Sequence, residues 1–256
     1  HGVAVIAYAT GAIIKNCYAT GNSLTSSGWG VYHGGQGVTY TGASGWTIAG
    51  NVKSRTSAMG IKPYGVWSGN TTSGVYELAE NAGTPTTPGT GEWGYNGTTV
   101  YVNIGAPSGG YSIAIIFQPN TNAVLMDCRG DDHLLFDAVG VGLDRGVVGG
   151  KILRCRGSGN LGSAVQVNQA SGVTVDGVLG IGNREAVYMS TVGGTCVVKG
   201  VTSDDLTYGV RGERVSVGAS LDFSNNLLIS STAILVTTNN GTVTNDYNAY
   251  TGSLSG

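Results

Sequence analysis

The sequence predicts an all-β fold, a solenoid in which short parallel strands stack coil upon coil. Three observations favour this fold: a strand-and-turn segment that recurs at a short period, abundant glycine, and few charged residues. The chain has 45 glycines among its 256 residues, and only 11% of its residues are charged. Ordinary soluble domains have about 7% glycine and about 25% charged residues. Such a composition favours strands and tight turns over solvated helices.

The recurring segment is a short strand of alternating apolar residues that ends in a polar turn. Cys128, Cys155, Val178 and Val201 occupy the same place in four copies, and the step from Cys155 to Val178 equals the step from Val178 to Val201. A second short apolar strand follows nearly every copy, with no helical period of about 3.6 residues between them. The copies are AIIKNCYATGN (12–22), VLMDCRGDDH (124–133), KILRCRGSGN (151–160), VTVDGVLGIGN (173–183) and CVVKGVTSDDL (196–206), with looser copies at 220–230 and 242–252.

One coil of this kind cannot bury its inward side chains alone. Stacking the next coil on it pairs every strand in parallel and extends a continuous core. Equivalent residues then lie about 4.8 Å apart along the stack, so we expect apolar side chains to stack like on like. We also expect the asparagines near the turns to form hydrogen-bonded ladders. These asparagines are Asn16, Asn22, Asn160, Asn183 and Asn225.

The IIKNCYATGN-type strand, with its asparagine at the bend, and the late phrase DYNAYTG (246–252) carry a resemblance to a known family. On these residues the chain resembles the right-handed parallel β-helix proteins of the pectate-lyase-like superfamily, over 1–37 and roughly 119–252. The resemblance implies a right-handed parallel β-helix. It does not single out an activity, because the superfamily includes lyases, hydrolases, phage tailspikes and inactive adhesins.

The loss of the period predicts three regions: first β-helix coils at 1–37, an inserted β-rich excursion at 38–118, and the main coils with the C-terminal end at 119–256. TTVYVNIG (98–105) follows the turn-like YNG and is typical of half a β-hairpin. We therefore expect an antiparallel hairpin region inside the excursion. The phrase GEWGYNGTTVYVN also resembles a tryptophan-containing hairpin insert of bacterial and phage β-helix proteins.

Three tryptophans lie in the excursion. A short two-layer module needs bulky core residues, so we expect Trp46 and Trp93 to be buried. Trp67, in PYGVWSGN, is the one that we expect to be exposed and able to stack on a sugar ring, since the CH faces of sugars pack on indole rings.

Composition excludes several function classes. The net charge is −2, and no basic run could neutralise a phosphate backbone, which argues against nucleic acid. No apolar segment approaches the length of a membrane span. The opening GVAVIAYATGAII lacks the cationic lead of a signal peptide, and a chain that starts at His1 is expected to be a processed product or a fragment.

The cysteines do not predict a cofactor. Cys17, Cys128, Cys155 and Cys196 lack CxxC or CxxH spacing, so zinc is not expected. No other cofactor or metal is indicated. We expect these side chains to be free, buried thiols, with a disulfide between stacked neighbours as the less favoured alternative.

The densest polar cluster is DCRGDDHLLFD. Asp131, Asp132 and His133 lie there on a predicted turn, and cleavage of a glycan needs a general acid with a base or nucleophile. These three are the candidate catalytic residues. The candidate substrate-binding residues are Asp137, Arg156, Arg184, Glu185 and Trp67.

A structural role for this cluster is the favoured alternative. A pair of aspartates at a turn usually accepts main-chain hydrogen bonds at a solvated bend, and Asp204–Asp205 recurs at a corresponding turn. The resemblance does not supply a mechanism either. The NTD, GHG and RIK partner motifs of polygalacturonase-like hydrolases are absent. The calcium-binding pattern of pectate lyases is not recognisable in the sequence either.

Three function classes remain. We expect an extracellular glycan-recognising module, located on a virion surface or secreted. Such a module is similar to a phage tailspike or tail fibre, which binds a surface polysaccharide and in some cases also depolymerises it. The alternatives are a secreted bacterial polysaccharide lyase or glycoside hydrolase, and a non-catalytic structural or adhesin shaft. Low charge with many Ser, Thr, Asn and Tyr residues suits neutral sugars. The uncapped opening strand suggests an upstream segment or partner that covers the N-terminal end, as in a larger assembly such as a homotrimer.

Overall fold

A computed structural model describes residues 3–6, 11–21, 29–34, 36–70, 74–106, 110–118, 120–134, 138–144, 146–215, 218–239 and 241–255. The chain forms two compact units. The first, the solenoid, comprises His1–Gly35 and Asn120–Gly256, and the second, the insert, comprises Gln36–Pro119. The described residues form strands and turns and no helix, so none could span a membrane as a helix.

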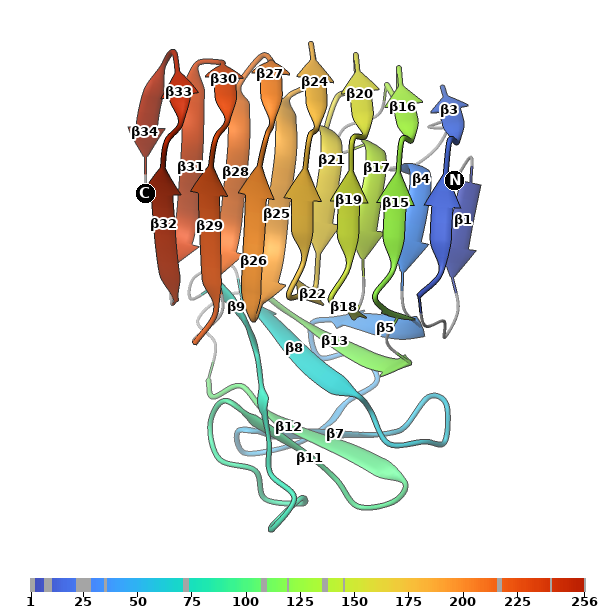
Figure 1. Ribbon diagram of the computed structural model, residues 1–256. Helices are drawn as coiled ribbons and strands as arrows, with labels where there is room; N and C mark the ends of the chain where they lie inside the picture. The colour runs from blue at the N-terminus through green and yellow to red at the C-terminus, as the bar shows by residue number, and fades with distance from the viewer. Residues whose placement is uncertain are drawn as a thin grey trace. The chain divides into compact units, whose positions relative to one another are not determined.

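The solenoid consists of three parallel sheets whose strands follow one another along the stack, with the two ends of the chain at opposite ends of the stack (Figure 1). Sheet A contains the longest strands. Its strands in stacking order are β1 (Val3–Ile6), β4 (Trp29–Gly34), β17 (Val139–Asp144), β21 (Ser163–Asn168), β25 (Glu185–Gly193), β28 (Tyr208–Val215), β31 (Thr232–Asn239) and β34 (Ser253–Ser255). A side branch of this sheet consists of β14 (Asn120–Thr121), β18 (Val147–Val148) and β22 (Ala170–Ser171).

Sheets B and C have seven strands each. Sheet B contains β2 (Ile13–Lys15), β15 (Val124–Met126), β19 (Lys151–Leu153), β23 (Thr174–Asp176), β26 (Thr195–Lys199), β29 (Ser220–Ser224) and β32 (Thr242–Asp246). Sheet C contains β3 (Tyr18–Thr20), β16 (Arg129–Asp131), β20 (Arg156–Ser158), β24 (Leu179–Ile181), β27 (Thr202–Asp204), β30 (Leu227–Ile229) and β33 (Ala249–Tyr250). The predicted all-β parallel solenoid is thus confirmed.

Each coil bends between sheets B and C at one residue with positive φ. Glycine adopts this left-handed conformation freely, and asparagine and aspartate tolerate it better than other residues. The predicted asparagine at the bend is present at Asn16 and Asn225. The bend residues are Asn16, Asp127, Arg154, Gly177, Gly200, Asn225 and Tyr247.

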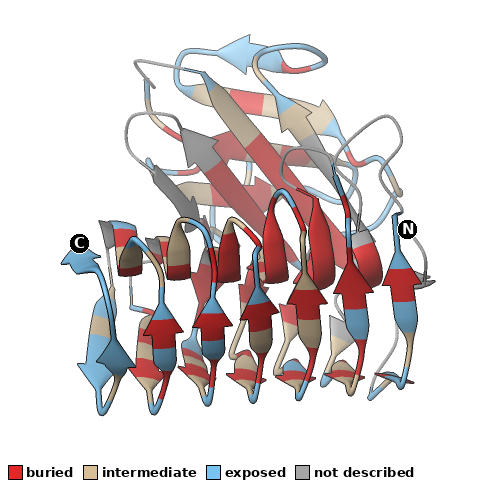
Figure 2. Ribbon diagram, turned by 90° about the horizontal axis from the view of Figure 1, so that it is seen from above, coloured by how far each residue is buried: buried red, intermediate tan, exposed pale blue. Residues whose placement is uncertain are grey.

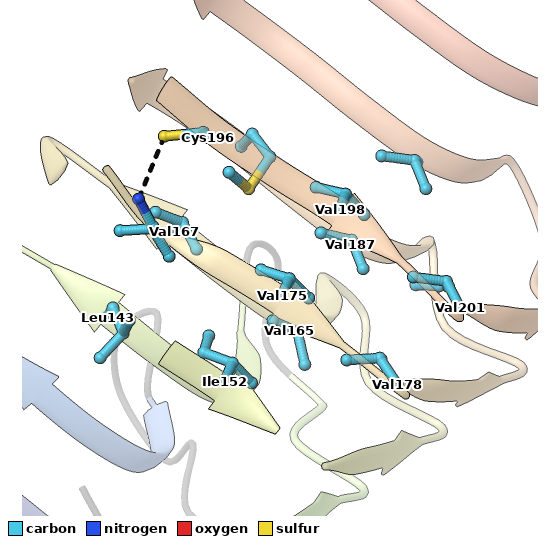
Figure 3. Packing of buried hydrophobic residues seen from close by; sticks show 14 of the residues in the cluster. Leu143, Ile152, Val165, Val167, Val175, Val178, Val187, Cys196, Val198 and Val201 are labelled. Atoms are coloured by element: carbon cyan, nitrogen blue, oxygen red, sulfur yellow. Dashed lines mark hydrogen bonds between the residues drawn. The ribbon is translucent and has the colours of Figure 1, made fainter. Parts of the chain in front are cut away.

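The core consists of columns of like side chains. In sheet B, Leu125, Ile152 and Val175 lie in register in successive coils, and all three are fully buried. Buried residues recur at the same level from strand to strand (Figure 2). The core is dominated by valine, leucine and isoleucine from sheets A and B, packed as Figure 3 shows. Cys196 belongs to it and accepts a hydrogen bond from the Val173 main-chain N–H at 3.4 Å.

Sheets A and C approach closely at one corner, where side chains are minimal. A Cβ atom on Gly157 would lie 2.6 Å from the Cα atom of Ala164, and one on Gly130 would lie 2.2 Å from the Gly140 carbonyl oxygen. Real Cβ atoms do not come so near to main-chain atoms. Glycine at 130 and 157 therefore allows the two sheets to meet without an intervening side-chain layer.

The insert contains two sheets, and all but one of their strand pairings are antiparallel. The hairpin of β11 (Glu92–Tyr95) and β12 (Thr99–Asn103) turns at Asn96 and confirms the predicted hairpin. One sheet contains β5 (Gln36–Thr41), β13 (Tyr111–Gln118), β8 (Gly65–Asn70) and β9 (Gly74–Glu77). The other contains β10 (Ala79–Glu80), β11 (Glu92–Tyr95), β12 (Thr99–Asn103), β7 (Val52–Thr56) and β6 (Thr47–Ala49).

The tryptophans of the insert are all buried. Trp46 and Trp93 belong to its main core, as predicted. The expectation that Trp67 is exposed is wrong, because only 2% of it is accessible. Strand β8 is covered on both faces: Val66 faces the main core, whereas Trp67 packs with Ala114 on the opposite face. A tryptophan in this position fills a second apolar layer.

Candidate functional site

The predicted catalytic cluster lies at the end of β16. Asp131 is buried, and both of its carboxylate oxygens have partners. Arg129 forms an ion pair with one oxygen. The other accepts hydrogen bonds from the Ser158 main-chain N–H at 3.0 Å and from its hydroxyl at 2.9 Å. The carboxylate therefore links two coils, and each of its oxygens already accepts at least one hydrogen bond.

The two residues after Asp131 differ sharply in exposure. Asp132 has a positive φ of 55° and an exposed side chain. His133 is fully buried, and its main-chain N–H donates to the Asn160 Oδ1 atom at 3.2 Å. Burial lowers the pKa of His133, although Asp131 and Asp132 oppose this effect. The structure thus brings the three residues together, but it presents only Asp132 to solvent.

A ladder continues from this bend along the stack and contains Asn160 and Asn183, two of the five asparagines expected to form ladders; Asn22 lies outside the described residues. The Asn160 main-chain N–H and Nδ2 donate to the Asn183 Oδ1 atom at 3.1 and 2.8 Å. Asn183 repeats both bonds to the Asp205 carboxylate, each at 2.8 Å. All three residues are buried. The ladder satisfies the main chain of the bend in successive coils.

A second ladder, not predicted, lies at the bend between sheets B and C. There Asn248 accepts bonds from the Asn226 main-chain N–H at 2.9 Å and Nδ2 at 2.8 Å. Asn226 in turn accepts the Val201 N–H at 2.9 Å. These asparagines follow Asn225 and Tyr247 and occupy the place of Cys155 in an earlier coil. The two asparagines are separated in the sequence by close to one period of the repeat, and this spacing is the signal that could have predicted the second ladder.

The remaining predicted binding residues either lie apart from one another or form an ion pair with each other. Arg156 is half-buried and stacks in register on Arg129. Arg184 forms a two-pronged ion pair with the buried Glu185, with both nitrogen–oxygen distances at 2.8 Å. Asp137 lies outside the described residues. Trp67 belongs to the insert and is buried.

The outer face of sheet A carries an aromatic–cationic group, here called the Tyr–Arg cluster: Tyr188, Tyr208 and Arg211. Tyr188 and Arg211 are register partners on β25 and β28. The guanidinium carbon lies 4.8 Å from the Tyr188 ring centre and 5.6 Å from that of Tyr208. Within the described part of the chain the Arg211 side chain makes no hydrogen bond or ion pair, and its buried Nε has no partner.

Polar groups flank this cluster along the same sheet. Gln166 is the register partner of Tyr188 in the preceding coil. Asn168 donates to Asp144 at 2.8 Å, and the Tyr32 hydroxyl donates to the same carboxylate at 3.1 Å. Side chains that can hydrogen bond therefore recur coil after coil on this face.

The Tyr–Arg cluster is not among the candidate sites that the sequence predicts. The signal was present, because Tyr188 and Arg211 are separated in the sequence by one full period of the repeat. Chemically, a guanidinium beside two phenol rings keeps donors for sugar hydroxyl or carboxylate oxygens, while the ring faces pack against CH groups. Within the described ranges no group of His, Cys, Asp and Glu residues could hold a metal ion.

Comparison with protein-family models, with curated proteins and with solved structures finds no match for the chain. The site is therefore interpreted from its own geometry.

Proposed function

We propose that this protein is an extracellular glycan-recognising module of the pectate-lyase-like β-helix type, acting as a tailspike or tail fibre does. The outer face of sheet A binds the polysaccharide. The observation that carries the proposal is the Tyr–Arg cluster, in which a cation without a counter-ion among the described residues lies beside two tyrosine rings. Its place on a parallel sheet gives it a rigid support.

The chemistry of the Tyr–Arg cluster fits a polymer of hydroxylated sugar rings. Tyr188 and Tyr208 offer ring faces for the CH faces of a sugar. Arg211 and Gln166 offer hydrogen-bonding groups to its hydroxyls. Since parallel coils repeat at about 4.8 Å, the face can follow an extended polymer over several coils. The low overall charge of the protein suits neutral polysaccharides.

Binding to immobilised polysaccharides tests the proposal. The panel compares the unaltered protein with Tyr188→Ala and Arg211→Ala, and with Lys199→Ala as a control on a different sheet. Cation–π and stacking contacts of this kind contribute about 1 to 2 kcal/mol, so each cluster variant should bind roughly tenfold more weakly. Equal binding by the two cluster variants and the control would rule out this face.

Virion-surface or secreted location and a homotrimeric assembly belong to the same proposal. A long, regular, weakly charged solenoid suits a spike that assembles side by side outside the cell. Sedimentation of the full chain distinguishes a trimer from a monomer. A monomer would remove the spike arrangement and leave glycan binding to be judged by the panel.

A second candidate is a polysaccharide lyase or glycoside hydrolase. The observation that favours it is Asp132, an exposed carboxylate beside the Arg129–Asp131 ion pair. Digestion of the same polysaccharides, followed by mass spectrometry, tests this activity: unsaturated products indicate a lyase and saturated products a hydrolase. Loss of cleavage in the Asp131→Asn and Asp132→Asn double variant would identify the site, whereas unchanged cleavage would exclude it.

The third candidate, a non-catalytic shaft, is supported by the same bend. The Asp131 side chain and the His133 main chain hold neighbouring coils together through hydrogen bonds. A protein that neither binds nor cleaves any member of the panel would fit this candidate.

A further inference from the structure

Three cysteines form a stack of thiols at the beginning of the solenoid. Lys15, Met126 and Leu153 are register partners just before the bend of three successive coils, and Tyr18, Arg129 and Arg156 are partners just after it. Two residues separate these partners in each coil. The second of the two is a cysteine in all three coils, at Cys17, Cys128 and Cys155.

The Cys128 and Cys155 thiols each contact carbonyl oxygens of two coils. Within their own coils they lie 3.2 Å from the Met126 oxygen and 3.4 Å from the Leu153 oxygen. The Cys128 thiol lies 3.5 Å from the Ile14 carbonyl oxygen of the preceding coil, and the Cys155 thiol lies 3.6 Å from that of Leu125. Coils paired in parallel are about 4.8 Å apart, which falls within the Cα separation of about 4.4 to 6.8 Å that a disulfide requires. The spacing of the coils along the stack is therefore compatible with the Cα separation of a disulfide between neighbouring cysteines.

The three thiols differ in access and acidity. Cys17 is half-buried, whereas Cys128 and Cys155 are each 1% exposed. The hydrogen bond from the Cys155 thiol lowers the pKa of Cys128, and burial raises the pKa of Cys17. A reagent in solution meets Cys17 first, while the thiol behind it ionises more readily.

We propose that Cys17 and Cys128 are a redox pair that closes into a disulfide and staples the coil before the insert to the coil after it. Both are free thiols in this structure. The link would enclose residues 18–127, which include the whole insert Gln36–Pro119. Strands β2 and β3, which pair with β15 and β16, are only three residues long each.

The oxidant is a low-molecular-weight disulfide such as oxidised glutathione. The Cys17 thiolate attacks one sulfur of the reagent, which forms a mixed disulfide and releases one thiolate. The Cys128 thiolate then attacks the Cys17 sulfur, forms the protein disulfide and releases the second. The protein loses two protons and two electrons, and the reagent is reduced to two thiol molecules.

Peptide mapping tests the proposal on the full chain. The protein is incubated with oxidised glutathione or with dithiothreitol, free thiols are alkylated, and the chain is digested with trypsin without reduction. Trypsin separates the three cysteines, because Cys17 falls in peptide 16–53, Cys128 in peptide 56–129 and Cys155 in peptide 155–156. We expect the oxidised sample to contain 16–53 linked to 56–129, and the reduced sample to contain both alkylated.

Variants and thermal unfolding complete the test. Oxidation should raise the unfolding midpoint of the unaltered protein, and dithiothreitol should reverse the rise. Cys17→Ser should abolish both the linked peptide and the shift, whereas Cys196→Ala, in a different column, should retain them. The proposal is overturned if both cysteines stay alkylated after oxidation, if the link joins Cys128 to Cys155, or if it joins two chains.

Discussion

Asn183 offers the sharpest test of how the coils are held together. Its side chain makes four hydrogen bonds at a fully buried site. It accepts from the Asn160 N–H at 3.1 Å and Nδ2 at 2.8 Å, and it donates to the Gly157 carbonyl at 3.0 Å and to Asp205 at 2.8 Å. We predict that Asn183→Ala strongly destabilises the solenoid.

The magnitude follows from the groups left behind. Alanine removes the only side-chain oxygen that accepts from Asn160, so one main-chain N–H and one amide proton lose that acceptor. A buried donor without a partner costs about 1 to 3 kcal/mol. Two such donors give a loss of about 2 to 6 kcal/mol in the free energy of unfolding. A domain is typically stable by only about 5 to 15 kcal/mol, so this loss is a large fraction.

Urea unfolding followed by far-ultraviolet circular dichroism measures the effect. The matched control is Asn51→Ala, which changes an exposed asparagine in the insert for which the structure shows no side-chain hydrogen bond. The control should unfold at the midpoint of the unaltered protein. If both variants unfold at that midpoint, the ladder does not stabilise the stack and the reasoning is refuted.

Three further predictions concern the same coils. Burial raises the pKa of Asp205 above the usual 3.8. The stability that this raised pKa contributes is therefore full below pH 3.8 and is lost as the pH rises through the pKa that Asp205 has in the folded protein. Asp205→Asn should therefore be more stable than the unaltered protein at neutral pH and lose this advantage in acid, as denaturant midpoints across pH will show. Gly157→Ala should cost about 1 to 3 kcal/mol in denaturant unfolding, because its Cβ would meet the Ala164 main chain. Asp131→Ala should lower the thermal midpoint, since it leaves the Ser158 N–H without its acceptor, whereas Asp132→Gly should not, since φ is positive there.

Controls separate these effects from nonspecific damage. Gly83→Ala is the match for Gly157→Ala, because its new Cβ would have one neighbour within 4 Å, the Asn81 Oδ1 atom at 3.9 Å. Asp222→Asn is the match for Asp205→Asn, since Asp222 is half-buried. A flat pH dependence of the Asp205 variant relative to the unaltered protein would contradict the assigned role of burial.

The stacking could be predicted because the repeat period sets the register. Cys128, Cys155, Val178 and Val201 align in sequence and occupy one column in the structure, since a parallel ladder places equivalent residues over one another. The Asn160–Asn183 ladder follows from the same rule. Aligning equivalent side chains in the sequence was enough to predict these columns, because neighbouring coils are nearly identical in geometry.

Exposure could not be predicted in the same way. Asp131 sits on a turn in the sequence, yet it is buried beside the corner where Gly130 meets Gly140. That close approach joins strands of two different sheets, and the alternation of residues within either strand does not indicate it. Trp67 shows the same limit, since its strand alternates normally but is buried on both faces. The repeat period identifies which residues stack on one another in successive coils, whereas the burial of a side chain also depends on the packing between different sheets.

The place of the insert has a consequence for how the chain folds. Ile14 pairs with Leu125, with the whole insert between them in the sequence, whereas Ile152 pairs with Val175 one repeat later. The first of these loops is about five times as long as the second, and closing it costs about 1.4 kcal/mol more in chain entropy, since the cost grows as (3/2)RT ln n. The later coils can therefore zip up on one another first, and the N-terminal coil should dock last. Pulse-labelled hydrogen exchange should show its amides protected after those of the other coils.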